Sequence, residues 1–450
     1  MRRNGIAFGV ALGLGGASAS AQEADLASRL TALEAELAQA QAVSAYVDNT
    51  FLFLVSGMVV MFMAAGFCML EAGLVRQKNA ATICLKNISL YALAGLAFYL
   101  CGYELMYGGQ TPFFGVPGPW APSDSLDTGY ASASDWFFQM VFVATAASVV
   151  SGALAERIKL WPFLIFVVLL CGLIYPIQGA WKWGGGWLDA LGFQDFAGST
   201  LVHSTGGWAA LTGAILLGPR TGKFDAQGRV RAMPGSNLPL AALGTFVLWM
   251  GWFGFNGGSQ LALGTEADAN AVAMIFANTN TAAAAGVVAA MALSQVRYGK
   301  VDLTLALNGA IGGLVSITAG PLDPALWQAM IIGGLGGILV VLVVPLLDRL
   351  RIDDVVGAIA AHLACGIWGT LAVAWTTQAE GLGPLSQLGV QALGVLAIGL
   401  FVSIASALIW LALKASFGIR ASQEDEYQGL DIAECGLEAY PEFSVSGKAR

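Results

Sequence analysis

The chain has 450 residues, of which 57% are hydrophobic and only 11% are charged, with 58 glycines. This composition excludes an ordinary soluble domain and indicates an all-α polytopic membrane protein. The net charge of −8 does not indicate a nucleic-acid partner, because in membrane proteins the placement of Lys and Arg among the loops is informative and their total is not.

Cysteine usage argues against a disulfide framework and against a zinc site. No two cysteines form a C-x-x-C pair, and most lie in apolar segments, where cysteine behaves as a small hydrophobic residue. We therefore expect neither a metal nor another cofactor. The six positions are Cys68, Cys84, Cys101, Cys171, Cys365 and Cys435.

Residues 1–21 have the features of a secretory signal peptide. Two arginines precede an apolar run at 6–15, and small residues end at Ala21, as at a cleavage site. The alternative is an uncleaved first anchor, but the run is short and rich in glycine. Cleavage would leave the mature N-terminus outside the membrane.

Residues 22–48 are predicted to form a helix on that outer side. Apolar residues recur at alternating four- and three-residue steps, which is the a/d spacing of a coiled-coil seam. An amphipathic helix on the membrane surface fits the same pattern. The apolar positions are Leu26, Leu30, Leu33, Leu37 and Ala40.

The membrane domain is expected at 49–414 and contains eleven hydrophobic segments of helix length. Their boundaries are predicted to within a few residues. The segments are 51–74, 81–106, 134–154, 161–180, 196–217, 238–258, 270–293, 302–319, 326–347, 356–376 and 387–413.

The charges of the connecting loops give an orientation. With the N-terminus outside, the outer loops contain only Lys182, so the positive-inside rule holds at every loop. The tail, 415–450, is then cytoplasmic, and the protein lies in the inner (plasma) membrane. The inner loops contain Arg76, Lys78, Arg157, Lys159, Arg220, Lys223, Arg229, Arg231, Arg297, Lys300, Arg349 and Arg351.

The only two histidines occur in two copies of one pattern. Each follows an aspartate by eight residues and precedes a glycine by four, in the fifth and the tenth predicted segments. Segments 1–5 and 6–10 would therefore be two five-helix units of opposite orientation, an inverted repeat with the eleventh helix outside it. Eight residues of helix rise about 12 Å, which would bring both histidines near the membrane midplane. The two sets are Asp195, His203 and Gly207, and Asp354, His362 and Gly366.

Ionisable side chains in apolar spans mark pathways or sites by default. Two histidines without a nearby Cys or carboxylate supply too few donors for the usual zinc set. A serine nucleophile beside His203 would need an oxyanion hole, and no such loop is visible. Two satisfied core histidines remain the structural alternative. A narrow pore lined by neutral imidazoles suits ammonia, a small solute that hydrogen-bonds and can leave its charge behind as a proton.

Aromatic residues cluster where a cation would enter. Trp136, Phe137 and Phe138 open the third segment, and Trp181 and Trp183 precede the fifth. Aromatic faces attract ammonium. An aromatic belt at the membrane interface is the competing interpretation.

Five motifs together resemble the ammonium transporter family, the Amt branch of the Amt/Mep/Rh group, and the resemblance runs from about Asn49 to Tyr440. It implies the eleven-helix inverted-repeat fold, a homotrimer with one pore per subunit, and ammonium uptake rather than an enzymatic activity. The motifs are DFAGSTLVH (195–203), GALAERI (152–158), GWFGFNGGS (251–259), EAGLVRQKN (71–79) and GAIAAH (357–362).

The resemblance also implies roles for single residues. His203 and His362 would be the twin pore histidines, and Asp195 a buried acid that shapes the recruitment site without binding the cation. Phe138, Trp183 and Ser259 would form the recruitment site. Phe138 and Phe255 would be the stacked gate below it.

Two further features bear on the resemblance. The tail at 423–440, with GLD (429–431) and GLEAY (436–440), resembles the family's regulatory tail, which implies control by a PII signalling protein. Glu71, an acid near the inner end of the first segment, departs from the expected apolar pattern. Its role is open.

The sequence leaves the transport mode open between a passive channel and an electrogenic transporter. Paired imidazoles would let a proton travel separately from ammonia. The alternatives are an Rh-like ammonia or carbon dioxide gas channel, an ammonium sensor, and a membrane-embedded metalloenzyme. The aromatic residues count against the gas channel, and fewer than forty residues follow Leu413, too few for a signalling domain.

Overall fold

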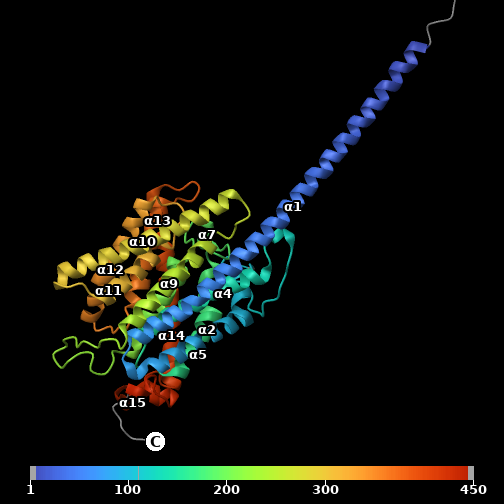
Figure 1. The fold of residues 1–450 in the computed structure, drawn as a ribbon. Helices are drawn as coiled ribbons and strands as arrows, with labels where there is room; N and C mark the ends of the chain where they lie inside the picture. The colour runs from blue at the N-terminus through green and yellow to red at the C-terminus, as the bar shows by residue number, and fades with distance from the viewer. Residues whose placement is uncertain (1–6, 110, 444–450) are drawn as a thin grey trace, which may run out of the picture.

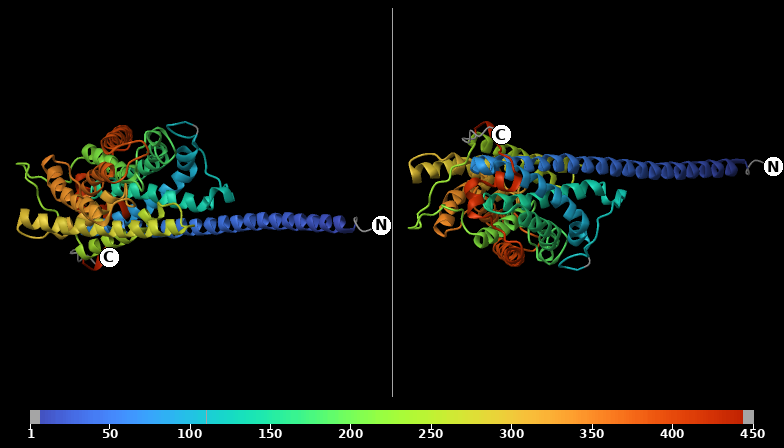
Figure 2. Two further views of the ribbon diagram at one scale, coloured as in Figure 1. Left: turned by 90° about the horizontal axis from the view of Figure 1, so that it is seen from above. Right: turned by 90° about the horizontal axis from the view of Figure 1, so that it is seen from below.

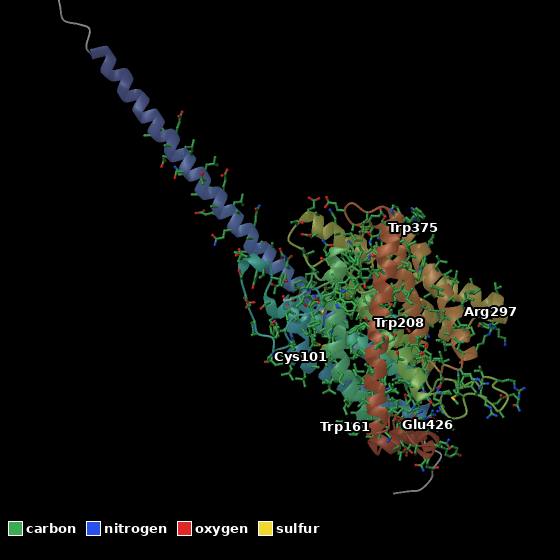
Figure 3. All side chains as sticks on the ribbon, turned by 180° about the vertical axis from the view of Figure 1, so that it is seen from behind. Cys101, Trp161, Trp208, Arg297, Trp375 and Glu426 are labelled. Carbon is green, nitrogen blue, oxygen red and sulfur yellow. The ribbon has the colours of Figure 1, made fainter. Side chains whose placement is uncertain are left out.

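A computed structural model describes residues 7–109 and 111–443, with side chains for 21–109 and 111–442. The described residues form helices and loops without a β-strand. The helices make one bundle, from which α1 (Ala7–Leu74) projects far beyond one end, while α15 (Gln423–Gln428) lies at the other (Figures 1 and 2). We call these the rod end and the tail end. Trp375 lies towards the rod end, and Trp161 and Glu426 lie at the tail end (Figure 3).

Nine helices in the described part of the chain are long and apolar enough to cross a membrane. The protein is therefore a multi-pass membrane protein. The spans are α1, α2 (Ala80–Ala97) continued by α3 (Tyr103–Tyr107), α4 (Ser132–Ala153), α5 (Leu160–Leu169) continued by α6 (Tyr175–Ala180), α9 (Leu238–Gly258), α10 (Glu266–Tyr298), α12 (Leu326–Arg349), α13 (Cys365–Thr376) with the turn before it, and α14 (Pro384–Ser416).

The other two predicted segments are helical but differ from the nine. Segment 302–319 is α11 (Leu303–Ile317), which is short and whose residues from Leu305 onward are all buried. Segment 196–217 is the π-helical turn η5 (Ser199–Ser204) followed by α8 (Thr205–Leu217). A short helix α7 (Trp187–Ala190) precedes it. The count of eleven crossings remains a prediction.

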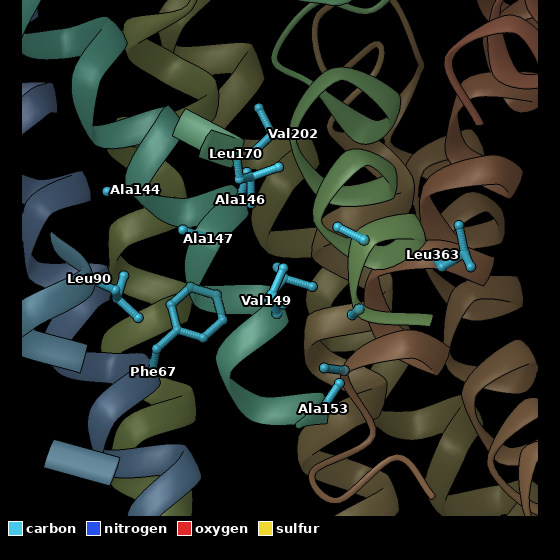
Figure 4. Close-up of a cluster of buried hydrophobic side chains, with 14 of the residues drawn as sticks. Phe67, Leu90, Ala144, Ala146, Ala147, Val149, Ala153, Leu170, Val202 and Leu363 are labelled. Atoms are coloured by element: carbon cyan, nitrogen blue, oxygen red, sulfur yellow. The ribbon is translucent and has the colours of Figure 1, made fainter. Parts of the chain in front are cut away.

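Close packing between helices depends on small residues. At Gly66, an added Cβ would come within 3.0 Å of the Gly244 carbonyl, so α1 and α9 touch through their backbones. Small residues at such contacts are how membrane helices approach closely without a hydrophobic driving force. Alanines of α4 likewise leave room for the Phe67 ring, which lies between Leu90 and Val149 (Figure 4).

The predicted helix at 22–48 continues into the first span without a break. Its leucines are exposed; Leu26 and Leu33 keep 66% and 61% of their accessible surface. The coiled-coil interpretation and the surface-helix interpretation both remain predictions. The first six residues of the predicted leader, 1–21, and its side chains through residue 20 lie outside the described part, so its removal also remains a prediction.

The tail end is held by a buried charge cluster. The Glu156 carboxylate forms salt bridges with Arg76 at 2.5 Å and with Arg220 at 3.1 Å. Arg220 forms a second salt bridge with Asp353 at 2.8 Å. Burial by itself raises the pKa of a carboxyl, but the hydrogen bonds and charge of Arg220 hold the pKa of Asp353 well below its usual range. Arg157, also fully buried, donates to four backbone carbonyls, among them that of Asp353 at 2.7 Å. The GALAERI motif thus joins the loops of this end.

The tail folds back against α2. The Asp431 carboxylate accepts hydrogen bonds from the backbone N–H groups of Ala81 at 3.0 Å and Thr82 at 2.8 Å. These are first-turn donors, which have no partner inside their own helix. Glu426 holds the tail from the other side, accepting from Arg420 at 2.7 Å and from the backbone of Thr221 at 2.9 Å.

Candidate functional site

Each histidine follows a turn that an aspartate and a glycine build together. Asp195 is fully buried, and its carboxylate accepts four backbone N–H groups, those of 198–201, at 2.8–3.2 Å. Asp354 accepts three, those of 358–360, at 2.8–3.4 Å. In both cases the carboxylate satisfies the free donors of a helix start.

A different glycine, three residues after each aspartate, allows the chain to enter that helix. Gly198 has φ 104° and Gly357 has φ 80°, a left-handed region that glycine occupies without steric cost. Both helices then open with a π-helical turn, η5 and η6 (Ile359–Ala364). Such turns are rare and are frequent at functional sites. The repeated motif seen in the sequence is therefore also a repeated local structure.

The two histidines meet side by side. His203 Nδ1 and His362 Nδ1 lie 3.3 Å apart, and both side chains are buried. A hydrogen bond between two imidazoles requires one ring to carry its proton on Nδ1 and the other to carry it on Nε2. His203 Nε2 has no hydrogen-bond partner among the described residues. His203 Nε2 is therefore available to hydrogen-bond a molecule that passes the pair.

On one side of the pair lies a cavity of about 380 Å³, which we call the aromatic vestibule. The residues that the sequence assigned to recruitment come together here. Trp183 is held by its indole N–H, which donates to the Asp195 carbonyl at 2.9 Å. The Ser259 hydroxyl donates to the Phe255 carbonyl at 2.8 Å, so its lone pairs face the cavity as acceptors. The lining is Tyr103, Tyr107, Tyr130, Asp135, Phe138, Gln139, Phe142, Trp183, Phe196, Ser259 and Leu261.

The gate of Phe138 and Phe255 remains a prediction, and the structure places a third ring beside the two. The ring stacked on Phe255 is Phe142, with centroids 4.0 Å apart and planes at 23°. Phe138 instead meets Phe142 edge-on at 4.8 Å. Phe138 and Phe142 are one helical turn apart on α4, so the sequence places both on the same face, and the ring nearer the histidines forms the stack. Phe255 also lies 5.2 Å from the His203 ring.

On the other side of the pair, two cavities follow one another. The first, which we call the small cavity, leaves a volume of about 10 Å³ for the centre of a water-sized molecule. Its lining includes Phe67, Glu71 and His362. The second, the charged vestibule, has about 440 Å³ and is lined by charged residues such as Arg220 and Asp354. Asn308 and Val356 line both. The vestibules, stacked rings, histidines and small cavity thus form one line through the bundle.

Among the described residues, no group of three or more His, Cys, Asp or Glu side chains could hold a metal ion. The buried Asp195 and the half-buried Asp354 are both occupied as helix caps. Neither is free to coordinate a cation beside the histidines.

Comparisons with known proteins agree with this architecture. The sequence profile of the Ammonium Transporter Family matches residues 51–440. The chain is 42% identical over 416 residues to ammonium transporter Amt2 of Archaeoglobus fulgidus, covering 87% of each. A solved structure titled Sensor Amt Protein superposes with a TM-score of 0.82 at 36% identity, over 87% of this chain and 98% of that one. The structure of Mep2 of Candida albicans superposes with a TM-score of 0.77 at 28% identity, over 90% of this chain and 93% of that one.

Proposed function

The chain belongs to the ammonium transporter family, and from that premise we propose that it takes up ammonium through the line of rings and histidines between its two vestibules. Ammonium transport itself is the activity for which its relatives are named, and the family is one of transporters rather than enzymes. The observation that carries the proposed route is the His203–His362 pair at 3.3 Å between a cation-attracting cavity and a charged one.

The proposed orientation places the aromatic vestibule outside the cell. Arg76, Lys78 and Arg220 of the basic loops contact Glu156 or the tail at the tail end, which by the positive-inside rule would face the cytoplasm of the inner membrane. The rod end and the N-terminal helix at 22–48 then face outward, after removal of 1–21. Eleven crossings, an inverted repeat of five and five, and a homotrimer complete the proposed architecture.

The proposed mechanism removes the charge before the narrow part of the pore. Moving a bare cation across a region of low dielectric costs several kcal/mol or more. Ammonium held against Trp183 and Phe138, with Ser259 as acceptor, can release a proton. Ammonia then passes Phe142 and Phe255 and moves along the imidazoles. Potassium has no proton to lose and is excluded.

The proton is proposed to follow separately along the histidine pair, which makes uptake electrogenic. An imidazole pair can accept a proton at one nitrogen and release it from another. A passive channel would return the proton outside. A sensor is the second candidate, favoured by the similarity to the Sensor Amt structure; it would bind ammonium without sustained current.

Two histidine variants test the route, with currents recorded from purified protein in solid-supported bilayers after ammonium and potassium jumps. His203→Asp places a fixed acid in the pore and is expected to admit potassium. His362→Ala leaves an apolar gap and is expected to slow ammonium without admitting potassium. Glu266→Gln, at the exposed start of α10, is the control. If both variants carry ammonium at the wild-type rate and selectivity, the pair is structural.

A further inference from the structure

Glu71 is a buried acid with half of its carboxylate unused. It lies near the end of α1 and is 1% exposed. Its Oε2 accepts from the Ser151 hydroxyl at 2.7 Å and from the Asn87 amide at 3.3 Å. Its Oε1 has no hydrogen-bond partner among the described residues. Leaving a buried carboxylate oxygen unpaired is costly, so such an atom needs a reason.

A buried base lies beside it. Lys86, on α2, is also 1% exposed, and its Nζ donates to the Ser151 carbonyl at 3.0 Å. The same Nζ lies 4.7 Å from the Phe163 ring centroid, a cation-π contact. Ser151 therefore connects the two, with its hydroxyl on the acid and its carbonyl on the base. A buried positive charge thus shares a bridging residue with the buried acid and offsets part of its burial cost, without a hydrogen bond to Oε1.

Glu71 lies on the line through the bundle, where a molecule moving through the pore can reach its unused oxygen. Glu71 and His362 line the same small cavity, which has room for the centre of one water-sized molecule. The small cavity shares Asn308 and Val356 with the charged vestibule. A molecule that leaves the histidines toward the charged vestibule therefore passes Glu71.

We propose that Glu71 is the terminal proton acceptor of the histidine line and the group that re-forms ammonium before release, a role that rests on the proposed function. A proton arriving through His362 binds the Glu71 carboxylate. The resulting carboxylic acid donates that proton to the ammonia that follows, which gives ammonium and restores the carboxylate. One positive charge crosses per ammonium, and no bond other than N–H and O–H changes.

Lys86 is a positioning residue in this scheme. It holds the backbone of Ser151, whose hydroxyl donates to Oε2 of the carboxylate and leaves Oε1 without a partner among the described residues. Its charge also favours the departure of ammonium toward the charged vestibule, because like charges repel across the low-dielectric cavity.

The test separates charge movement from ammonium binding in the full-length protein. Current after an ammonium jump reports proton passage, and calorimetric titration with ammonium chloride reports recruitment at the aromatic vestibule. Glu71→Gln keeps the shape and the Ser151 hydrogen bond but cannot take up a proton. We expect its current to fall at least about tenfold while its ammonium affinity stays at the wild-type value. Glu266→Gln is the matched control and should change neither quantity.

The outcomes are distinguishable. Wild-type current in Glu71→Gln overturns the proposal, whereas absence of current in the wild-type protein refutes the proposed electrogenic function instead. If Glu71→Gln does not fold, Glu71→Asp decides, because it keeps an acid at shorter reach. It should carry current with an altered pH profile, and a profile identical to that of the wild type would show that the carboxylate is only structural.

Discussion

The Trp183 side chain is held in place by a hydrogen bond and still lines the aromatic vestibule, where its ring can contact a cation. Its indole N–H is occupied by the Asp195 carbonyl, so the donor does not point into the vestibule. Its ring and that of Phe142 are nearly perpendicular, with centroids 6.0 Å apart, and Trp183 lines the cavity. A cation is attracted to the face of such a ring and would be repelled by a free N–H donor.

We expect Trp183→Leu to weaken ammonium recruitment while leaving the fold intact. The loss of about 0.5–2 kcal/mol of cation-π attraction corresponds to an apparent affinity about 2- to 30-fold lower. Calorimetric titration with ammonium chloride measures it. Trp161→Leu, which removes a 71%-exposed ring at the tail end, is the control. An unchanged affinity in Trp183→Leu would remove this ring from the site.

Single residues of the site were predictable where their chemistry is unusual for a membrane. Two histidines in a chain of this composition stand out, and their repeated aspartates identify the motif. Phe142 was missed because α4 is buried on almost all sides, so hydrophobic periodicity distinguishes no face. Which of the two phenylalanines of α4 stacks on Phe255 depends on how far α9 is shifted along its axis relative to α4. No residue spacing in the sequence gives that shift.

At the scale of elements, the turns before the histidines decide where the imidazoles lie. In Gly198→Ala the new Cβ would meet Val202 at 2.5 Å in a backbone conformation with φ 104°. We expect the free energy of unfolding to fall by about 1–2 kcal/mol or more. A lower melting temperature in detergent and a reduced current measure this effect.

Gly389→Ala provides the comparison for that experiment. Gly389 lies in α14, where an added Cβ meets nothing within 4 Å. Alanine favours a helix over glycine by about 1 kcal/mol, so this variant should be at least as stable as the wild type. Equal stability of the two variants would contradict the role given to the turn.

Hydropathy predicted the helical segments well because membrane helices must be long and apolar. It did not predict the π-helical turns η5 and η6, each of which follows a left-handed glycine and an aspartate that caps several N–H groups. Nor did it predict that the helix at 22–48 runs unbroken into the first span, so that both belong to α1. No glycine or proline separates the two, and this absence was the available signal.

At the scale of the whole molecule, the tail binds the start of α2 and the loop after α8 at the tail end of the bundle. We expect truncation after Arg420 to lower uptake while membrane insertion remains intact, because the spans do not depend on the tail for their apolar surface. Asp431→Asn is the subtler variant, since it weakens the cap on Ala81 and Thr82 by about 0.5–2 kcal/mol. Uptake and membrane content of the variants measure the two effects separately.

The half-buried Asp425, whose side-chain contacts stay within its own short helix and its N-cap Ser422, offers a control as Asp425→Asn. Full uptake by the truncated protein would contradict a role of the tail in transport. Binding of a PII protein to the wild type but not to the truncated chain would support the predicted partner.

The cap that Asp431 places on α2 also has a consequence for synthesis. The two groups it joins are separated by about 350 positions in the chain, so one of the first membrane helices to leave the ribosome is completed by one of the last segments. Until then, the first turn of α2 has N–H groups that only water can satisfy. An incomplete chain therefore has an uncapped α2 at the tail end, and folding of this helix start cannot finish before the tail is translated.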